Sequence, residues 1–241
     1  MAIRIRLRTE ATTRARLGEK VLNELRTQLR PVDCQTCGRR FRRWQTPALA
    51  VYADGPVAIA LIHHGRCHPA GWHDEPYRSP GGVPHLTWRA GAFTLPAEVA
   101  PALLTDDVPF FLVNPAYEAM PLHRDDDGAW RMATQDIFRA SGFAHGLTTL
   151  TSTTPTPELT ARIDGERISV TVGTPARHEW PNITIPPSTA DLARSRGSIL
   201  VGVTTLLDAN GPLPLDDLLV LITLNLLAVG VAALPEPTPA T

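Results

Sequence analysis

Near the start of the chain, apolar residues recur at the spacing of an α-helix. Between residues 12 and 30 they form one stripe, while the basic side chains point elsewhere. Pro31 follows this segment, and proline cannot continue a helix. The sequence therefore predicts an amphipathic N-terminal helix that packs one face on the rest of the protein. The stripe consists of Leu17, Val21, Leu22, Leu25 and Leu29.

Further along, short apolar runs separated by turn residues indicate β-strands. Residues 47–64 predict a hairpin, because two apolar runs flank Asp54 and Gly55, a dipeptide that favours a tight turn. More strands are expected at 110–113, 119–124 and 129–134. The aspartates and the glycine at 125–128 predict the turn that joins the last two.

One pattern occurs twice in the chain. Phe93-Thr94-Leu95-Pro96 matches Ile183-Thr184-Ile185-Pro186, and each is followed by a short helical stretch and then an apolar strand. The polar, proline-containing segment 151–158 lies between the two copies and has the composition of a linker. We therefore predict an internal repeat, with two related α+β halves built from short antiparallel strands and helices.

The segment from Leu218 to Leu234 has no charged residue and approaches the length of a membrane span. Asn225 and Gly230 interrupt it, and two aspartates precede it in what would be the first turn of a helix. Acidic residues are favoured there by the positive end of the helix dipole. The pattern predicts a buried helix followed by a buried strand, and a membrane partner is not expected.

Composition narrows the class of protein. The chain has 241 residues, 43% hydrophobic and 20% charged, which is typical of one large or two small globular domains. No apolar leader follows Met1, and three cysteines cannot all form disulfides within one chain, so a cytoplasmic location is expected.

The net charge of −1 hides a basic segment, because residues 1–43 hold twelve Lys or Arg and only four acids. This segment favours a polyanionic partner, unless its arginines pair with the protein's own acids.

All three cysteines lie in one short window, together with a histidine at matching spacing. Two residues separate Cys34 from Cys37, and two separate His64 from Cys67. Two soft ligands on each of two tight turns is the spacing of a tetrahedral zinc site. Because three thiolates and one imidazole fill all four positions, we predict a structural Zn²⁺ that replaces a local hydrophobic core. His63 and His68 are alternatives to His64 as the fourth ligand.

The segments DCQTCGRRF at 33–41 and LIHHGRCHP at 61–69 resemble treble-clef zinc fingers, with a knuckle, a hairpin and a second ligand pair in that order. The ligand order Cys-x-x-Cys, then His-x-x-Cys, is similar to that of poly(ADP-ribose) polymerase-type fingers and of the first half of LIM modules. This resemblance covers residues 34–67 only. Polymerase-type fingers bind DNA breaks and LIM modules bind proteins, so the resemblance implies zinc and leaves the partner open.

The residues after the second cysteine alternate arginines with aromatic rings. Such a stretch suits contacts to phosphates and stacking on bases. The alternative is that the arginines neutralise the thiolates and the rings pack beside the zinc. The candidate nucleic-acid-binding residues are Arg26, Arg30, Arg39, Arg40, Arg42, Arg43 and Trp44.

Sequence motifs for catalysis are scarce. The chain has no phosphate-binding loop, no HExxH pair and no GxSxG elbow. Surplus acid–base groups gather only at 63–75, where a zinc-dependent hydrolase or deaminase would use Glu75 as its base. The glutamate of the deaminase signature is missing, and three thiolates make zinc a weak Lewis acid. We therefore assign no catalytic residue.

Together these patterns predict an α+β protein with an inserted zinc module and a basic N-terminal helix. The expected domains are a basic strand and helix at 1–31, a first half at 32–150 with its zinc module at 34–68, the linker at 151–158, and a second half at 159–241 with a flexible C-terminal tail. The expected function is non-enzymatic binding of DNA or RNA through a basic face. The alternatives are a protein–protein adaptor or scaffold with structural zinc, and the zinc-dependent hydrolase or deaminase.

Overall fold

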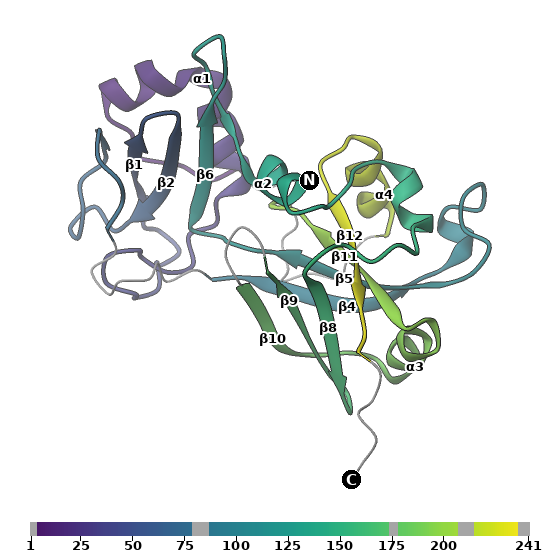
Figure 1. Cartoon of the computed structure of the whole chain (residues 1–241). Helices are drawn as coiled ribbons and strands as arrows, with labels where there is room; N and C mark the ends of the chain where they lie inside the picture. The colour runs from purple at the N-terminus through teal and green to yellow at the C-terminus, as the bar shows by residue number, and fades with distance from the viewer. Residues whose placement is uncertain (1–3, 79–86, 174–177, 207–214, 236–241) are drawn as a thin grey trace. The chain divides into compact units, whose positions relative to one another are not determined.

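The computed structural model describes residues 4–78, 87–173, 178–206 and 215–235, and Figure 1 shows their path. These residues form helices and two β-sheets, which confirms the predicted α+β class. The last six residues of the predicted C-terminal tail lie outside the described residues.

The chain divides into two compact units. Unit 1 combines Met1–Trp88 with Pro115–Thr134, and unit 2 combines Arg89–Asn114 with Gln135–Thr241. The chain therefore passes three times from one unit to the other. These bounds differ from the sequence halves at 32–150 and 159–241, because Val108–Asn114 pairs with the distant strand Ser198–Val203, whereas Ala119–Arg124 pairs with Val57–His63.

Unit 1 is a five-stranded sheet with a helix, α1 (Ala11–Gln28), that is kinked at Gly18, where φ is +72°. The strand order is β3-β1-β2-β6-β7. The bounds are β1 (Ala48–Asp54), β2 (Val57–His63), β3 (Gly71–His73), β6 (Ala119–Arg124) and β7 (Trp130–Met132). β1 and β2 form the predicted hairpin, with Asp54 opposite Val57 and Gly55 at φ +61° in the turn. A left-handed φ of this kind is easiest for glycine.

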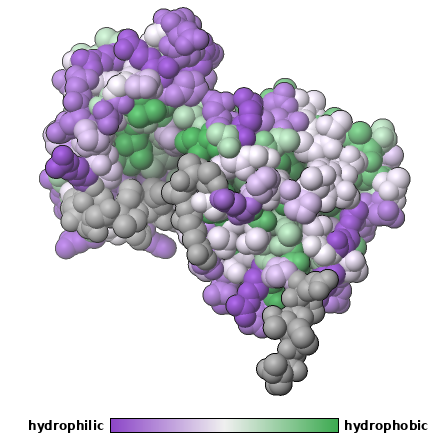
Figure 2. All heavy atoms as spheres, viewed as in Figure 1, coloured by the Kyte–Doolittle hydropathy of each residue, from purple (hydrophilic) through white to green (hydrophobic). Residues whose placement is uncertain are grey.

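Helix α1 packs on one face of this sheet. All five leucines and valines of the predicted stripe are buried, and they contact side chains such as Leu49, Val51 and Ile62. Strand residues alternate between the two faces of a sheet, so Ala50, Tyr52 and Leu61 lie on the opposite face. Figure 2 shows hydrophilic side chains over the outer surface of the part of unit 1 that carries α1. The N-terminal helix is therefore amphipathic, as its sequence predicts.

Unit 2 is built on a seven-stranded sheet, whose order is β10-β9-β8-β12-β11-β5-β4. The two edge strands β10 and β4 contact each other, so the sheet is nearly closed into a barrel. The bounds are β4 (Arg89–Leu95), β5 (Val108–Asn114), β8 (Leu159–Asp164), β9 (Arg167–Val172), β10 (His178–Thr184), β11 (Ser198–Val203) and β12 (Ala228–Ala233). The helical elements are η1 (Ala97–Val99), α2 (Thr134–Ala140), η2 (Leu147–Thr151), α3 (Pro187–Arg196) and α4 (Leu215–Thr223).

The two copies of the predicted repeat both lie in this sheet. Each runs from a strand through a helical turn or helix into another strand, β4-η1-β5 in the first and β10-α3-β11 in the second. Their pairing differs, since β4 is antiparallel to β5 whereas β11 lies parallel to β5 and does not pair with β10. A common origin of the two copies stays a prediction.

The uncharged segment near the C-terminus forms part of helix α4 and then strand β12. Leu218, Ile222 and Val229 are buried in the apolar core of unit 2. No helix among the described residues combines the length and the apolar character that crossing a membrane requires.

Candidate functional site

The two predicted ligand pairs come together at one end of the unit 1 sheet. Cys34 and Cys37 lie in the connection between α1 and β1, and His64 and Cys67 follow directly after β2. One atom from each of the four residues lies within 4.8 Å of the others. Tetrahedral bonds of about 2.3 Å from zinc to sulfur place two sulfur atoms about 3.8 Å apart, so the cluster can hold a metal ion with small adjustments.

Local backbone structure explains how each pair is formed. The amide of Gly38 donates to the carbonyl of Cys34 at 2.8 Å, and Gly38 has a φ of +63°. The amide of Cys67 donates to the carbonyl of His64, also at 2.8 Å. The amide of His64 donates to Cys34 Sγ at 3.2 Å and so joins the two turns. Each turn therefore holds its two side chains on the same side, toward the other turn.

His64 is the histidine of the cluster. Its Nδ1 lies 3.5 Å from Cys37 Sγ and 3.9 Å from Cys67 Sγ. His63 points elsewhere, with Nδ1 at 2.8 Å from Thr36 Oγ1, and both ring nitrogens of His68 are bonded to other groups. Neither alternative histidine belongs to this set.

The three thiols differ in their surroundings. Cys34 is buried, Cys37 is exposed and Cys67 is intermediate. Burial raises the pKa of Cys67, and its hydrogen bond with Cys37 adds to this effect. Burial also opposes ionisation of Cys37, but hydrogen bonds from the Arg39 backbone and from the other two thiols outweigh it and lower the pKa of Cys37. Cys37 is therefore the first of this pair to become a thiolate.

A buried carboxylate supports the first turn. Glu118 is fully buried beside β6, where Oε1 accepts from the amide of Asp33 at 3.0 Å and Oε2 accepts from the amide of Thr87 at 2.8 Å. Burial raises the pKa of Glu118. Because Asp33 directly precedes Cys34, Glu118 fixes the start of the ligand turn. No sequence pattern pointed to this role, since Glu118 is distant from the cysteines along the chain.

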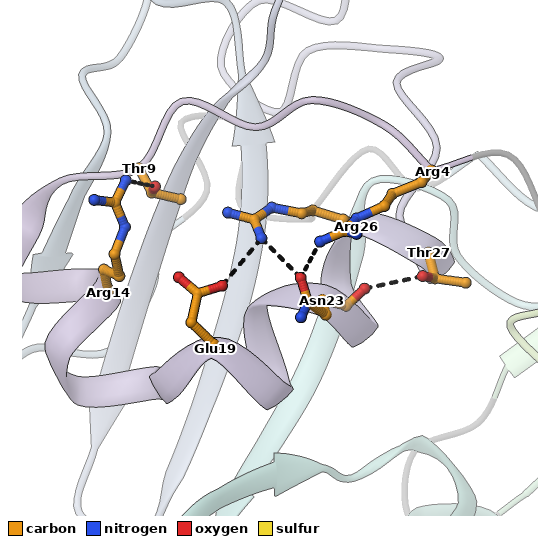
Figure 3. A network of polar contacts seen from close by, with 7 residues as sticks. All are labelled: Arg4, Thr9, Arg14, Glu19, Asn23, Arg26 and Thr27. Atoms are coloured by element: carbon orange, nitrogen blue, oxygen red, sulfur yellow. Dashed lines mark hydrogen bonds and ion pairs between the residues drawn. The ribbon is translucent and has the colours of Figure 1, made fainter.

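The predicted basic residues divide into two groups. Arg26 is only 17% exposed and donates to Asn23 at 2.8 Å and to Glu19 at 3.4 Å. Figure 3 shows Arg26 within this network on α1. Arg30 is partly buried and donates to the carbonyls of Thr27 and Leu29. These two arginines bond within the fold of unit 1.

The second group is an exposed surface beside the cysteine cluster. Arg39, Arg40, Arg42 and Arg43 are exposed, and none of them forms an ion pair with an acid within the described ranges. Trp44 is 77% exposed, and the Arg42 guanidinium lies 5.8 Å from its ring centre. We call these five residues the basic surface.

Two further arginines, which the sequence patterns did not single out, lie at the second ligand turn. Arg66 is exposed next to Cys67. The guanidinium of Arg8 lies so close to Gly65 that a Cβ at that glycine would be 2.8 Å from Arg8 Nη1. Both ligand turns therefore carry positive charge. Arg66 was visible in the sequence beside the second cysteine pair, whereas Arg8 reaches the site only through the fold.

A cavity lined largely by tyrosine and histidine rings adjoins the cluster on the face of the sheet opposite α1. The rings of Tyr52, His68 and His73 contact one another there, with centroid separations from 4.6 to 5.9 Å. Burial raises the pKa of Tyr52 to about 12, and burial together with the neighbouring imidazoles lowers the pKa of His63 to about 4. Of the histidines in the predicted group at 63–75, His64 thus belongs to the Cys/His cluster, whereas His63, His68 and His73 lie outside it.

Comparison with protein-family models, with characterised proteins and with solved structures gave no match. The proposal for the function of this site therefore rests on its geometry.

Proposed function

We propose that Cys34, Cys37, His64 and Cys67 bind a structural Zn²⁺ as a treble-clef-like finger. Soft thiolates with one imidazole, gathered within 4.8 Å, form a donor set that suits zinc. A zinc ion bound to all four has no open position for water, so the arrangement favours a structural role over a hydrolytic one.

We propose further that the basic surface beside this zinc binds nucleic acid. The observation that carries the proposal is the run of exposed arginines, Arg39, Arg40, Arg42 and Arg43, without acidic partners among the described residues. Guanidinium groups bind phosphate oxygens, and an exposed indole such as Trp44 can stack on a base. The partner is therefore DNA or RNA, in contact with unit 1.

Neutralisation of the thiolates does not account for this charge. Zinc with three thiolates carries a net charge of −1, which one arginine balances. The two ligand turns carry six arginines, the four of the basic surface together with Arg8 and Arg66. The excess positive charge remains available to a polyanion.

The test is fluorescence anisotropy of the zinc-loaded protein with labelled single strands and duplexes across a salt series. Four phosphate contacts on a single strand predict a slope of about −3 in the plot of log affinity against log salt concentration. The variant Arg39→Glu/Arg42→Glu should lose most of the affinity. The matched control Arg162→Glu/Arg167→Glu makes the same charge change at two exposed positions of unit 2 and should retain it. Equal losses in both variants, or no binding at low salt, would contradict the proposal.

The adaptor alternative has one supporting observation. Val220, Leu224 and Leu226 are 53%, 60% and 38% exposed at the end of α4 and just after it. Apolar side chains grouped on a surface favour a protein contact. Sedimentation velocity of the wild type and of Leu224→Ser over a range of concentrations would show whether this patch drives self-association.

A further inference from the structure

The cavity beside the zinc ligands is the strongest unassigned feature of unit 1. Its volume is about 270 Å³, and Thr36, Tyr52, His63, His68 and Tyr77 line it. Cavities for drug-sized ligands measure roughly 300–1,000 Å³, so this one suits a group of the size of a single ring system.

Strand alternation explains why so many polar rings meet here. Along β2, Leu61 and His63 lie on the Tyr52 face, whereas Ile62 lies on the α1 face. His64 continues this alternation and turns toward the cysteines. The cavity and the cluster are therefore on opposite sides of the same strand end.

Hydrogen bonds fix the orientation of the cavity wall. The carbonyl of Pro69 can only accept, so His68 Nδ1 donates to it at 2.8 Å. In the neutral ring His68 Nε2 is then an acceptor, and the hydroxyl of Tyr52 donates to it at 2.8 Å. The hydroxyl proton of Tyr52 is thus engaged in the hydrogen bond to His68. The hydroxyl oxygen of Tyr52 can still accept a hydrogen bond from a ligand.

One buried group of the wall lacks a partner. His63 is 1% exposed, and its Nδ1 is bonded to Thr36 Oγ1 at 2.8 Å. Its Nε2 is buried and has no hydrogen-bond partner among the described residues. Buried polar atoms are nearly always paired in folded proteins. A bound group that reaches His63 Nε2 would supply the missing bond.

Two exposed residues of opposite charge, Glu75 and Arg78, complete the lining. A ligand that suits the whole cavity is flat, so that it stacks on one of the two tyrosine rings, Tyr52 or Tyr77, which are tilted by 59° to each other. Its edge carries donors for the carboxylate of Glu75 and acceptors for the guanidinium of Arg78. A nucleobase has this combination, and guanine presents both kinds of group, with N2–H₂ as donor and O6 and N7 as acceptors.

We propose that this cavity receives one unstacked base of a single-stranded nucleic acid, with a preference for guanine. The inference rests on the proposed function, because the phosphates on either side of that base would contact the basic surface. Thr36 lines the cavity and lies three residues before Arg39, so their Cα atoms are within about 11 Å of each other. The base and the phosphates of one strand can therefore be bound together.

The test uses strands of about nine nucleotides that are abasic either at every position or at every position except a central guanine. Zinc-loaded, full-length protein should bind the guanine-bearing strand about tenfold more tightly than the strand without a base, since stacking of one base contributes at that level. Adenine, cytosine and thymine at the centre should give smaller gains.

Variants locate the effect. Glu75→Gln and Arg78→Gln change exposed side chains, leave the stacking rings in place and should reduce the guanine gain to that of the other three bases. The matched control Asp54→Asn removes an exposed carboxylate outside the cavity and should keep the full preference for guanine. Zinc content and circular dichroism of each variant verify that it is folded. A preference for guanine over the other bases that survives both Glu75→Gln and Arg78→Gln would overturn the inference.

The two proposals fail in different ways. Equal affinity for the strands with and without the base would overturn the cavity inference and leave phosphate binding in place. If no strand binds, free guanosine is added while the NMR signals of the Tyr77 and His63 rings are followed. Shifts would keep the cavity as a base site and overturn the role of the basic surface, and unchanged signals would overturn both.

Discussion

The two units of the molecule bury different kinds of groups. The described part of unit 2 encloses a large apolar core, in which Phe110, Leu112 and Ile222 pack against neighbouring strands and α4. Unit 1 has a comparable apolar core under α1, yet the opposite end of its sheet buries His63, His64 and Glu118. Burying polar groups is unfavourable unless they are paired, so unit 1 retains them at a cost in stability. A binding site is therefore expected in unit 1, whereas the apolar core of unit 2 accounts for the stability of that unit.

Removal of the metal is expected to have the largest effect, and this effect should be confined to unit 1. Cys34→Ala, or chelation of the wild type, should unfold the ligand turns and loosen β1 and β2, because zinc-finger sites owe about 10–16 kcal/mol of apparent free energy to zinc. Hydrogen exchange would measure this as lost amide protection in unit 1. The protection of β11 and β12 in unit 2 should remain.

Adding zinc back provides the control. It should restore the chelated wild type and leave Cys34→Ala unchanged. Full protection of β1 and β2 after chelation would mean that unit 1 is stable without the metal, and the contrast between the units would be lost.

A second change should affect unit 2 alone. A Cβ at Gly202 would lie 2.7 Å from a ring carbon of the buried Phe110, so Gly202→Ala forces the core of β11 and β5 to shift. Overpacking of this kind costs about 1–3 kcal/mol. Denaturant unfolding followed by hydrogen exchange should place the loss in unit 2, with metal affinity unchanged. In Gly202→Ala/Phe110→Leu the clash is removed, so the two effects should not be additive.

A loss of similar size is expected for Glu118→Gln in unit 1. The side-chain amide has one acceptor oxygen in place of two, so one of the amides of Asp33 and Thr87 loses its partner, at a cost of about 1–3 kcal/mol. Chemical denaturation would measure it. The matched variant Asp54→Asn makes the same type of change at an exposed site and should have little effect.

The same substitution has a defined pH dependence. Folding raises the pKa of Glu118 above its ordinary value of 4.5, so folding favours the protonated carboxyl, and this contribution is complete below pH 4.5. The hydroxyl oxygen of a protonated carboxyl still accepts a hydrogen bond, whereas the NH₂ group of Gln cannot. This contribution is lost as the pH rises through the raised pKa of the folded state. The advantage of the wild type over Glu118→Gln should therefore narrow as the pH rises above 4.5. A widening difference would contradict the assigned sign.

The smallest effect on stability is expected for Trp44→Ala. The side chain is 77% exposed, so its removal should change the free energy of unfolding by less than about 0.5 kcal/mol. Oligonucleotide affinity should fall several-fold, because a stacking ring is lost from the basic surface. Anisotropy and thermal unfolding of the same sample would separate the two. A large loss of stability would mean that Trp44 belongs to the core of unit 1.

The sequence predicted features that depend on neighbouring residues. Leucine spacing identified α1, Asp54 and Gly55 identified the first hairpin, and residue spacing identified the four Cys and His residues that come together. Pairing between distant strands has no such signal, since nothing in the apolar run of β5 indicates that it pairs with the parallel β11 as well as with the antiparallel β4. The cavity was unpredictable for the same reason. Tyr52, His68 and Tyr77 meet only when β1, β3 and the ligand turn are all in place.

The threefold passage of the chain between the units has a consequence for synthesis. Cys67 completes the ligand set early, whereas β6 and β7, which complete the sheet of unit 1, are translated only after β4 and β5 of unit 2. A nascent chain can thus capture its metal before the sheet around it exists. The bound ion would then hold β1 and β2 as a platform on the ribosome, ready for the strands that arrive later.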